Sequence, residues 1–396
     1  MTSSKDFEID ADELLELAKD LIRIPSIYTQ EAEISSYIYG RLDEWGVSPR
    51  RIPVEGHGPC VVAQIGDEGF PSIVLNGHMD TVEVMAGWEH DPFGAELEDG
   101  RLIGLGALDM KCGLASMMVA FRALAEAEPT KGHRIIFQAV SGEEDNGSGT
   151  RTLIQSGEFE GAEAAIVGEG FGGLSAVTHG RRGGAYYAFE VKGQSAHGAT
   201  PNLGKNAIVD ASKIICALEK SELAVSNALR SDALELLRET QTVLRIAGGG
   251  SSLSVPERCT IEFMRCTIPG GRTDLRGELK SLVQELSLEC EVDIRFKGGP
   301  GDLYLPYLTN PESALVRAAV ASITEYTGKE PALVCGVSEA DDNLISQELS
   351  VPVICVGPGE LGEMARYHRP EESIGVSQLT AAAKVYCSTV NRLCGT

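Results

Sequence analysis

The sequence predicts an α/β domain with a largely parallel sheet, interrupted by a smaller α+β domain. Several segments are short and nearly all apolar, which is typical of strands buried on both faces of a sheet. Helical segments alternate with these strands along the chain, as expected for α/β architecture. After Gly183 the pattern changes to half-buried strands and helices in the order β-α-β-β-α-β, which is the ferredoxin-like order.

The first part of the chain supplies the elements of the α/β domain. Residues 11–23 have apolar positions at helical spacing with acids early, and Pro25 ends the helix. The Ala-, Met- and Leu-rich segment 113–127 predicts another helix between apolar strands. The remaining elements predicted here are a helix at 31–45 and strands at 60–65, 72–75, 134–140 and 164–167.

The inserted domain is predicted to cover residues 184–298. Its elements are strands at 185–191, 242–246, 258–267 and 291–296 and helices at 206–219 and 275–286. The breaker segment 248–252 separates two of the strands, and the glycine-rich segment 298–301 closes the insert. The α/β pattern then resumes with a helix at 314–326, an apolar run at 353–356 and a helix at 378–393. The α/β domain is therefore predicted to consist of residues 1–183 and 299–396.

Composition excludes several classes of partner. The 396 residues include 58 acids and 34 bases, and the formal net charge of −24 argues against binding to nucleic acid or to an anionic membrane. No apolar stretch approaches the roughly 18 residues needed to span a bilayer. The first residues lack the apolar core of a secretory signal. The ten Cys are scattered and form no Cys-x-x-Cys motif, which predicts reduced thiols and a cytoplasmic protein.

The segment 74–82 is the most informative motif. An apolar run ends in His78 and Asp80, and residues two apart in an extended strand point to the same side. A His that binds metal usually needs a carboxylate on its second nitrogen or close behind it, which fixes the ring and raises its basicity. Alone, the pair could equally be a solvated strand end.

Four further segments place acids or a His after apolar strands or in loops. They hold Asp109 in 104–113, Glu143 and Glu144 in 141–145, Glu169 in 168–170, and His368 in 367–372. Each has an ordinary structural alternative: a helix cap for Asp109, a turn for Glu143, Glu144 and Glu169, and a surface loop for His368. Together, acids crowded at the carboxyl ends of strands would repel one another unless cations neutralise them. Imidazole and carboxylate ligands suit zinc, with cobalt or manganese as substitutes.

At this point the sequence resembles the M20 metallopeptidase and deacylase family, whose motifs fall in order from residue 74 to residue 372. The resemblance implies a zinc-hydrolase-type catalytic domain with two divalent metal ions, zinc or in its place cobalt or manganese. It makes Asp109 the bridge, through a cis peptide to the next residue. The terminal ligands it implies are His78 and Glu169 for one metal and Glu144 and His368 for the other.

The same resemblance implies the roles around the metals. Glu143 would be the general base, and Asp80 would orient His78. The insert would be a lid and dimerisation domain of a homodimer, in which His197, in the motif 195–201, stabilises the oxyanion in the neighbouring subunit. Arg265 would contact a substrate carboxylate; its structural alternative is a surface charge, and that of His197 is a turn residue.

Some positions depart from the family pattern. Leu105 stands where the family frequently has an Arg, and Cys112 where it frequently has a Gly. Ser254 lies near the position of the usual Asn of the lid, so a contact of that Asn with substrate is not readily transferred to this chain. Glu169, in place of Asp, favours the deacylase and carboxypeptidase branches over the aminopeptidase branch.

The expected function is a two-metal amide hydrolase that deacylates an N-acyl amino acid, similar to acetylornithine deacetylase or a desuccinylase. The alternative is a dipeptidase or glutamate-carboxypeptidase-like enzyme with the same site. A serine-hydrolase elbow, a phosphate-binding loop, a complete dinucleotide fingerprint and a His-Glu-x-x-His motif are all absent from the sequence. A non-catalytic binding protein on this fold would be expected to have lost Glu143 or a ligand, and none is lost.

Overall fold

The computed structural model describes residues 7–127, 132–250, 253–271, 274–296 and 303–395. The chain divides into two compact units. Unit 1 comprises Met1–Gly180, Arg230–Glu235 and Leu308–Thr396, and unit 2 comprises Arg181–Leu229 and Leu236–Tyr307. Unit 2 therefore interrupts unit 1 in the sequence.

The centre of unit 1 is a large mixed sheet. Its middle strands β6, β3, β7 and β18 are parallel neighbours, while β2 and β8 flank them in the antiparallel direction. The middle strands are almost entirely buried, which explains their apolar sequences. The strands are β1 (Arg50–Ile52), β2 (Cys60–Ile65), β3 (Ser72–His78), β6 (Arg134–Val140), β7 (Ala162–Val167), β8 (Ala176–Arg181), β16 (Tyr307–Leu308), β17 (Ala332–Gly336) and β18 (Val353–Cys355).

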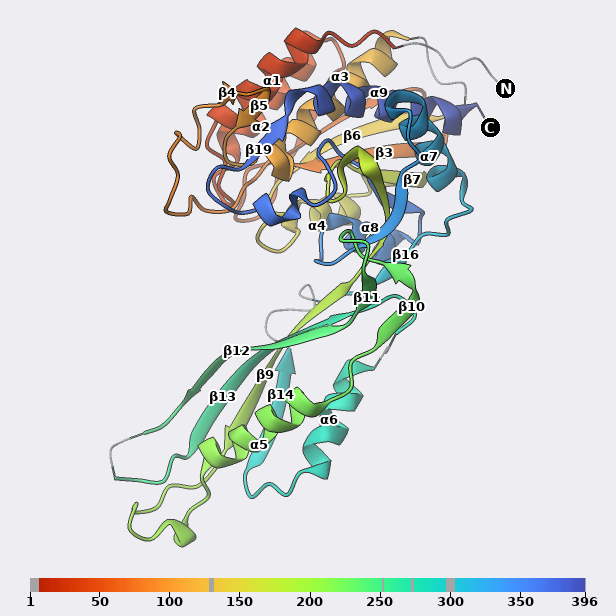
Figure 1. The fold of residues 1–396 in the computed structure, drawn as a ribbon. Coiled ribbons are helices and arrows are strands. Elements are labelled where there is room, and N and C mark those ends of the chain that lie inside the picture. The colour runs from red at the N-terminus through yellow and green to blue at the C-terminus, as the bar shows by residue number, and fades with distance from the viewer. Residues whose placement is uncertain (1–6, 128–131, 251–252, 272–273, 297–302, 396) are drawn as a thin grey trace. The chain divides into compact units, whose positions relative to one another are not determined.

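Helices cover both faces of this sheet (Figure 1). One face carries α1 (Ala11–Arg23), α3 (Cys112–Glu126), α7 (Ala314–Thr327) and α9 (Val376–Cys394), and the other carries α4 (Ser148–Gln155) and α8 (Asp341–Leu349). Helix α2 (Ala32–Glu44) packs on β2. The α/β fold class is confirmed.

Helix α1 illustrates how the sequence sets these elements. The Asp10 side chain accepts hydrogen bonds from the backbone N–H groups of Asp12 and Glu13, which caps the helix. Its buried residues recur at helical spacing and face the core of unit 1. Helix α3 is buried nearly all round because it lies between the sheet, α1 and α9.

A second, small sheet brings distant segments of unit 1 together. Strand β5 (Arg101–Ile103) pairs with β4 (Glu96–Glu98) on one side and with β19 (Ser373–Gly375) on the other. The chain just before Asp109 is thereby fixed to the chain just after His368.

Unit 2 has the ferredoxin-like arrangement. Its antiparallel strands lie in the order β12-β13-β9-β14, and the apolar side chains of Phe189, Ile261 and Phe263 pack in its core with α5. The predicted β-α-β-β-α-β order is confirmed. The elements are β9 (Gly183–Lys192), α5 (Ala207–Lys220), β12 (Thr240–Gly248), β13 (Arg258–Thr267), α6 (Leu275–Glu285) and β14 (Glu291–Phe296), with β15 (Leu303–Tyr304) also paired to β9.

One hairpin was not expected from the sequence. Strands β10 (Val225–Arg230) and β11 (Leu236–Arg238) form a separate two-stranded sheet, whose intervening residues belong to unit 1, where Ser231 pairs with Cys335. The closing segment predicted at 298–301 lies outside the described residues, as do residues 251 and 252 of the predicted breaker. Within the described chain, no helix combines the length and the apolar character needed to cross a membrane.

Candidate metal centre

His78 is the last residue of the buried strand β3. Its Nδ1 donates a hydrogen bond to the backbone carbonyl oxygen of Asp80 at 3.0 Å, while the nearest carboxylate oxygen of Asp80 is 3.8 Å away. The Asp80 carboxylate instead accepts a hydrogen bond from the backbone N–H of Glu144 at 3.0 Å. Asp80 therefore holds the His78 ring through its main chain and the Glu144 turn through its side chain. Because Nδ1 is engaged, Nε2 is the ring atom that faces the centre.

Asp109 lies between two imidazoles. Its Oδ1 is 3.0 Å from Nε2 of His78, and its Oδ2 is 3.2 Å from Nε2 of His368. Burial would raise the pKa of Asp109, but the hydrogen bonds with His368 and His78 outweigh it and hold the pKa below its ordinary value. The peptide from Asp109 to Met110 is cis.

The two histidines are correspondingly basic. The hydrogen bonds to Asp109 and Glu144 raise the pKa of His368 to about 10. Burial would lower the pKa of His78, but its hydrogen bond to Asp109 and the charges of neighbouring carboxylates raise it well above the ordinary value. Both rings thus occupy positions where positive charge is strongly favoured.

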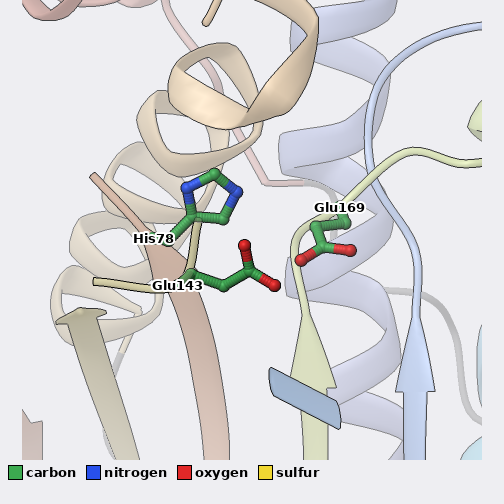
Figure 2. Close-up of side chains that lie close together, drawn as sticks. All are labelled: His78, Glu143 and Glu169. Carbon is green, nitrogen blue, oxygen red and sulfur yellow. The ribbon is translucent and has the colours of Figure 1, made fainter. Parts of the chain in front are cut away.

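Glu143 and Glu144 follow strand β6, which pairs with β3 so that Val140 lies opposite His78. Their side chains diverge. Glu144 Oε2 is 3.2 Å from Nε2 of His368, and its buried Oε1 has no hydrogen-bond partner among the described residues. Glu143 points into the space between His78 and Glu169, as Figure 2 shows.

Two groups of potential ligand atoms share His78. One consists of His78, Glu143 and Glu169, the other of His78, Asp109 and Glu144, and within each group the atoms lie within 4.8 Å of one another. Burial and the charge of Glu169 raise the pKa of Glu143 well above its ordinary value, and burial and Asp109 raise that of Glu144. Cations relieve such crowding of acids, and the buried Oε1 of Glu144, which has no hydrogen-bond partner within the described segments, fits a ligand atom. Imidazole and carboxylate donors in this combination fit divalent zinc, cobalt or manganese.

The two predicted site residues of the insert lie in unit 2. His197 is exposed in the loop after β9, where its Nδ1 accepts a hydrogen bond from the Ala199 N–H at 3.1 Å and its backbone bridges to Ser254. Arg265 is buried on β13, with its guanidinium 3.0 Å from Glu239 and 3.2 Å from Glu278. Arg265 is thus paired with acids within its own unit.

Sequence reasoning assigned no role to Glu372, Lys111 or His57. Burial, followed by the charge of Asp109, raises the pKa of Glu372 to about 8, and burial lowers the pKa of Lys111 to about 7. His57 lies under the turn that carries Glu143, with its Nδ1 3.0 Å from buried Glu31. The only sequence signal was proximity, since Glu372 closely follows His368 and Lys111 closely follows Asp109.

Curated relatives match nearly the whole chain. The succinyl-diaminopimelate desuccinylase of Magnetococcus marinus is 26% identical over 389 residues, covering 95% of this chain and 97% of the relative. That of Rhodospirillum centenum is 28% identical over 393 residues, covering 95% and 96%.

Solved structures share the fold. Aminopeptidase PepT from Bacillus cereus superposes with a TM-score of 0.77 at 21% identity, covering 97% of this chain and 99% of that one. The Bacillus subtilis YXEP protein, described as a dinuclear metal binding peptidase from the M20 family, gives a TM-score of 0.73 at 15% identity, covering 98% and 99%.

The model of one family, described as peptidase family M20/M25/M40, matches residues 74–392, which include all the residues of the candidate centre. The chain therefore belongs to peptidase family M20/M25/M40 and is a metal-dependent hydrolase that acts on amide or peptide bonds.

Proposed function

We propose that the chain is a deacylase that uses two divalent metal ions, zinc in the first instance, to hydrolyse the amide bond of an N-acyl amino acid. The observation that carries the proposal is the position of Asp109, whose two carboxylate oxygens face His78 and His368 separately. A carboxylate that presents one oxygen to each of two ligand groups is suited to bridge two cations.

The remaining ligands follow from their neighbours. Glu169 lies in the same group as His78, and we assign both to one metal. Glu144 lies 3.2 Å from His368, and we assign both to the other. When bound, the ions would lower the pKa of a water and polarise the substrate carbonyl.

The chain's own residues then perform the proton transfers. Glu143 is half-buried beside Glu169, and burial together with the charge of Glu169 raises its pKa, which suits a group that must both take and return a proton. We propose that it accepts the proton of the attacking water and passes it to the leaving nitrogen. Asp80 keeps the His78 ring in place through its carbonyl oxygen.

Unit 2 would complete the site. The Nδ1 atom of His197 accepts a backbone N–H, so a neutral ring carries its proton on Nε2 and can donate it to an oxyanion. We propose that His197 does so in the partner subunit of a homodimer. Arg265 would reach a substrate carboxylate only by exchanging one of its present acidic partners, Glu239 or Glu278.

The acyl amino acid is favoured over a peptide as substrate for two reasons. The desuccinylase relatives match over nearly their full length, and Glu169 is the residue expected of the deacylase and carboxypeptidase branches. The alternative, a dipeptidase or carboxypeptidase, uses the same residues, and the aminopeptidase PepT has the same fold.

The test is a substrate panel with the purified, metal-loaded protein. N-acetyl amino acids, N-succinyl amino acids and dipeptides are compared by kcat/KM, with Glu143→Ala as the inactive control. Preference for an N-acyl substrate supports the deacylase. Preference for dipeptides supports the alternative, and no hydrolysis of any amide contradicts both.

We further propose that the protein is cytoplasmic. Most of the ten cysteines are buried, which fits thiols kept reduced in the cytoplasm. Fractionation of the native cells tests the location, and light scattering on the purified protein tests the proposed dimer.

A further inference from the structure

Glu372 is a buried carboxylate that the proposed mechanism does not use. Its residue is 1% exposed. Its Oε1 accepts hydrogen bonds from the backbone N–H groups of Leu108 at 2.7 Å and Asp109 at 3.0 Å, and its Oε2 accepts one from Gly106 at 3.2 Å. A single side chain therefore holds three N–H groups of the turn that carries Asp109.

The main chain of Glu372 is fixed to the same region. Its carbonyl oxygen accepts a hydrogen bond from the Gly104 N–H at 3.0 Å, and the next residue, Ser373, pairs with Ile103 in the β19–β5 ladder. Since His368 lies only four residues earlier, Glu372 links the segment of one proposed ligand to the turn of another.

A buried lysine lies close by in the sequence. Lys111 is fully buried, and its Nζ donates a hydrogen bond to the carbonyl oxygen of Ile24 at 2.8 Å. The carboxyl group of Glu372 offers two acceptor oxygens to the three N–H donors of the turn, whereas the amide of a Gln would offer one.

Unit 2 contains another buried carboxylate that accepts hydrogen bonds from backbone N–H groups, Asp210, and it serves for comparison. The buried Asp210 accepts hydrogen bonds from the backbone N–H groups of Glu289 at 2.7 Å and Cys290 at 2.8 Å, and neither of these is a proposed ligand. What distinguishes Glu372 is that one of its donors is the N–H of Asp109, whose carboxylate must face two ligand groups at once.

We propose that Glu372 is a positioning residue for the bridging ligand. It fixes the backbone of Leu108 and Asp109 so that the two oxygens of the Asp109 carboxylate face His78 and His368 separately, as a residue that would hold two cations requires. This inference rests on the proposed two-metal function.

The test measures metal affinity and coordination rather than activity alone. Metal-free wild type, Glu372→Gln and the control Asp210→Asn are titrated with Co²⁺, and binding is followed by calorimetry and by the visible absorption of the cobalt protein. Glu372→Gln is expected to bind Co²⁺ about 10–100-fold more weakly, with an altered spectrum, because loss of a group that orients a ligand typically has this effect. Asp210→Asn should lower the melting temperature and leave Co²⁺ affinity and spectrum unchanged.

The outcomes separate the two proposals. If wild type fails to bind two Co²⁺ ions, the proposed centre is wrong, whatever Glu372 does. If wild type binds two and Glu372→Gln matches it in affinity and spectrum, Glu372 only stabilises the turn and the inference is overturned. Should Glu372→Gln not fold, Glu372→Asp, which keeps the charge but shortens the side chain, takes its place with the same expected weakening.

Discussion

The imidazole of His57 lies so close to Gly142 that a β-carbon on Gly142 would be 2.7 Å from Cε1 of the ring. His57 is held there by Glu31, which also accepts a hydrogen bond from the Gly58 N–H at 2.8 Å. The hydroxyl of Ser141 donates to the Gly58 carbonyl oxygen at 2.7 Å. The segment 57–58 thus supports the turn from which Glu143 and Glu144 project.

Gly142→Ala is expected to lower both stability and kcat. Gly142 has φ +70°, a conformation that costs a residue with a side chain about 1–2 kcal/mol, and the collision with His57 should add about 1–3 kcal/mol. The matched control is Gly46→Ala, because Gly46 has φ +76° and open space around it. Urea unfolding and steady-state kinetics measure both variants.

A double mutant tests whether the contact with His57 is the cause. His57→Ala removes the ring, so Gly142→Ala should cost less free energy of unfolding in that background than in wild type. Equal costs in the two backgrounds, or an equal loss of kcat in Gly46→Ala, would show that the ring does not support this turn.

The adjacent residues Glu143 and Glu144 should respond differently to truncation. Glu143→Ala should lower kcat by at least about 10²–10⁴-fold, the usual contribution of a general base, and retain both metals. Glu144→Ala should lose one metal, because this side chain lies 3.2 Å from His368 and has a buried oxygen without a hydrogen-bond partner in the part of the chain that the structure describes. Elemental analysis of each variant after dialysis measures how many metal ions it retains. Since Glu143 also lies within ligand distance of His78 and Glu169, equal metal loss in both variants would assign it as a ligand instead.

Much of unit 1 could be predicted because its strands are buried on both faces. The run at 134–140 is apolar except for Arg134 and Gln138, and β6 has the predicted bounds. Polar residues that closely follow such runs, such as His78 and Glu143, could be predicted as site residues, because ligands bind at the carboxyl ends of the strands in α/β sheets. The ferredoxin-like order of unit 2 could be predicted because its strands alternate apolar and polar residues and its helices repeat apolar residues at helical spacing.

Contacts between segments far apart in the sequence could not be predicted. Glu372 and Leu108 are 264 positions apart, and nothing local in either segment indicates that one holds the other. For Asp80, the sequence identified the residue but not the atom that contacts His78. Its position suggested that the carboxylate would hold the His78 ring, but the carbonyl oxygen of the same residue lies within hydrogen-bond distance instead. The β10–β11 hairpin escaped notice because its strands are short and mostly exposed.

His179 should make the protein less stable in mild acid. It is buried on β8, its Nδ1 donates to the Thr309 carbonyl oxygen at 2.8 Å, and burial lowers its pKa below 6.5. The unfolded chain therefore takes up a proton at a higher pH than the folded chain does. Stability is lost as pH falls below about 6.5 and levels off below the folded-state pKa.

The variant His179→Gln keeps a donor for Thr309 but cannot be protonated. The unfolding free energies of wild type and variant are compared between pH 8 and pH 5. Wild type is expected to lose more stability than the variant over this interval. If the difference between the two proteins is the same at both pH values, the buried neutral form of His179 is not the cause.

His197 is the residue whose role depends most on assembly. It is exposed in unit 2, with Nδ1 occupied by the Ala199 N–H and Nε2 left as the donor. Its truncation to Ala should lower kcat by about 10²–10³-fold, as expected for loss of one oxyanion donor, and leave metal content unchanged.

Subunit mixing tests whether His197 acts across a dimer. Glu143→Ala and His197→Ala should each have very low activity alone. In a mixed dimer, the site that keeps Glu143 receives His197 from the other subunit and is complete, so activity should return on mixing. Exchange is verified with differently tagged subunits, and the controls are each variant carried through the same exchange alone. If mixed dimers form and no activity returns, His197 serves its own chain or stabilises its loop, because a residue that acts within one chain cannot repair a neighbour that lacks it.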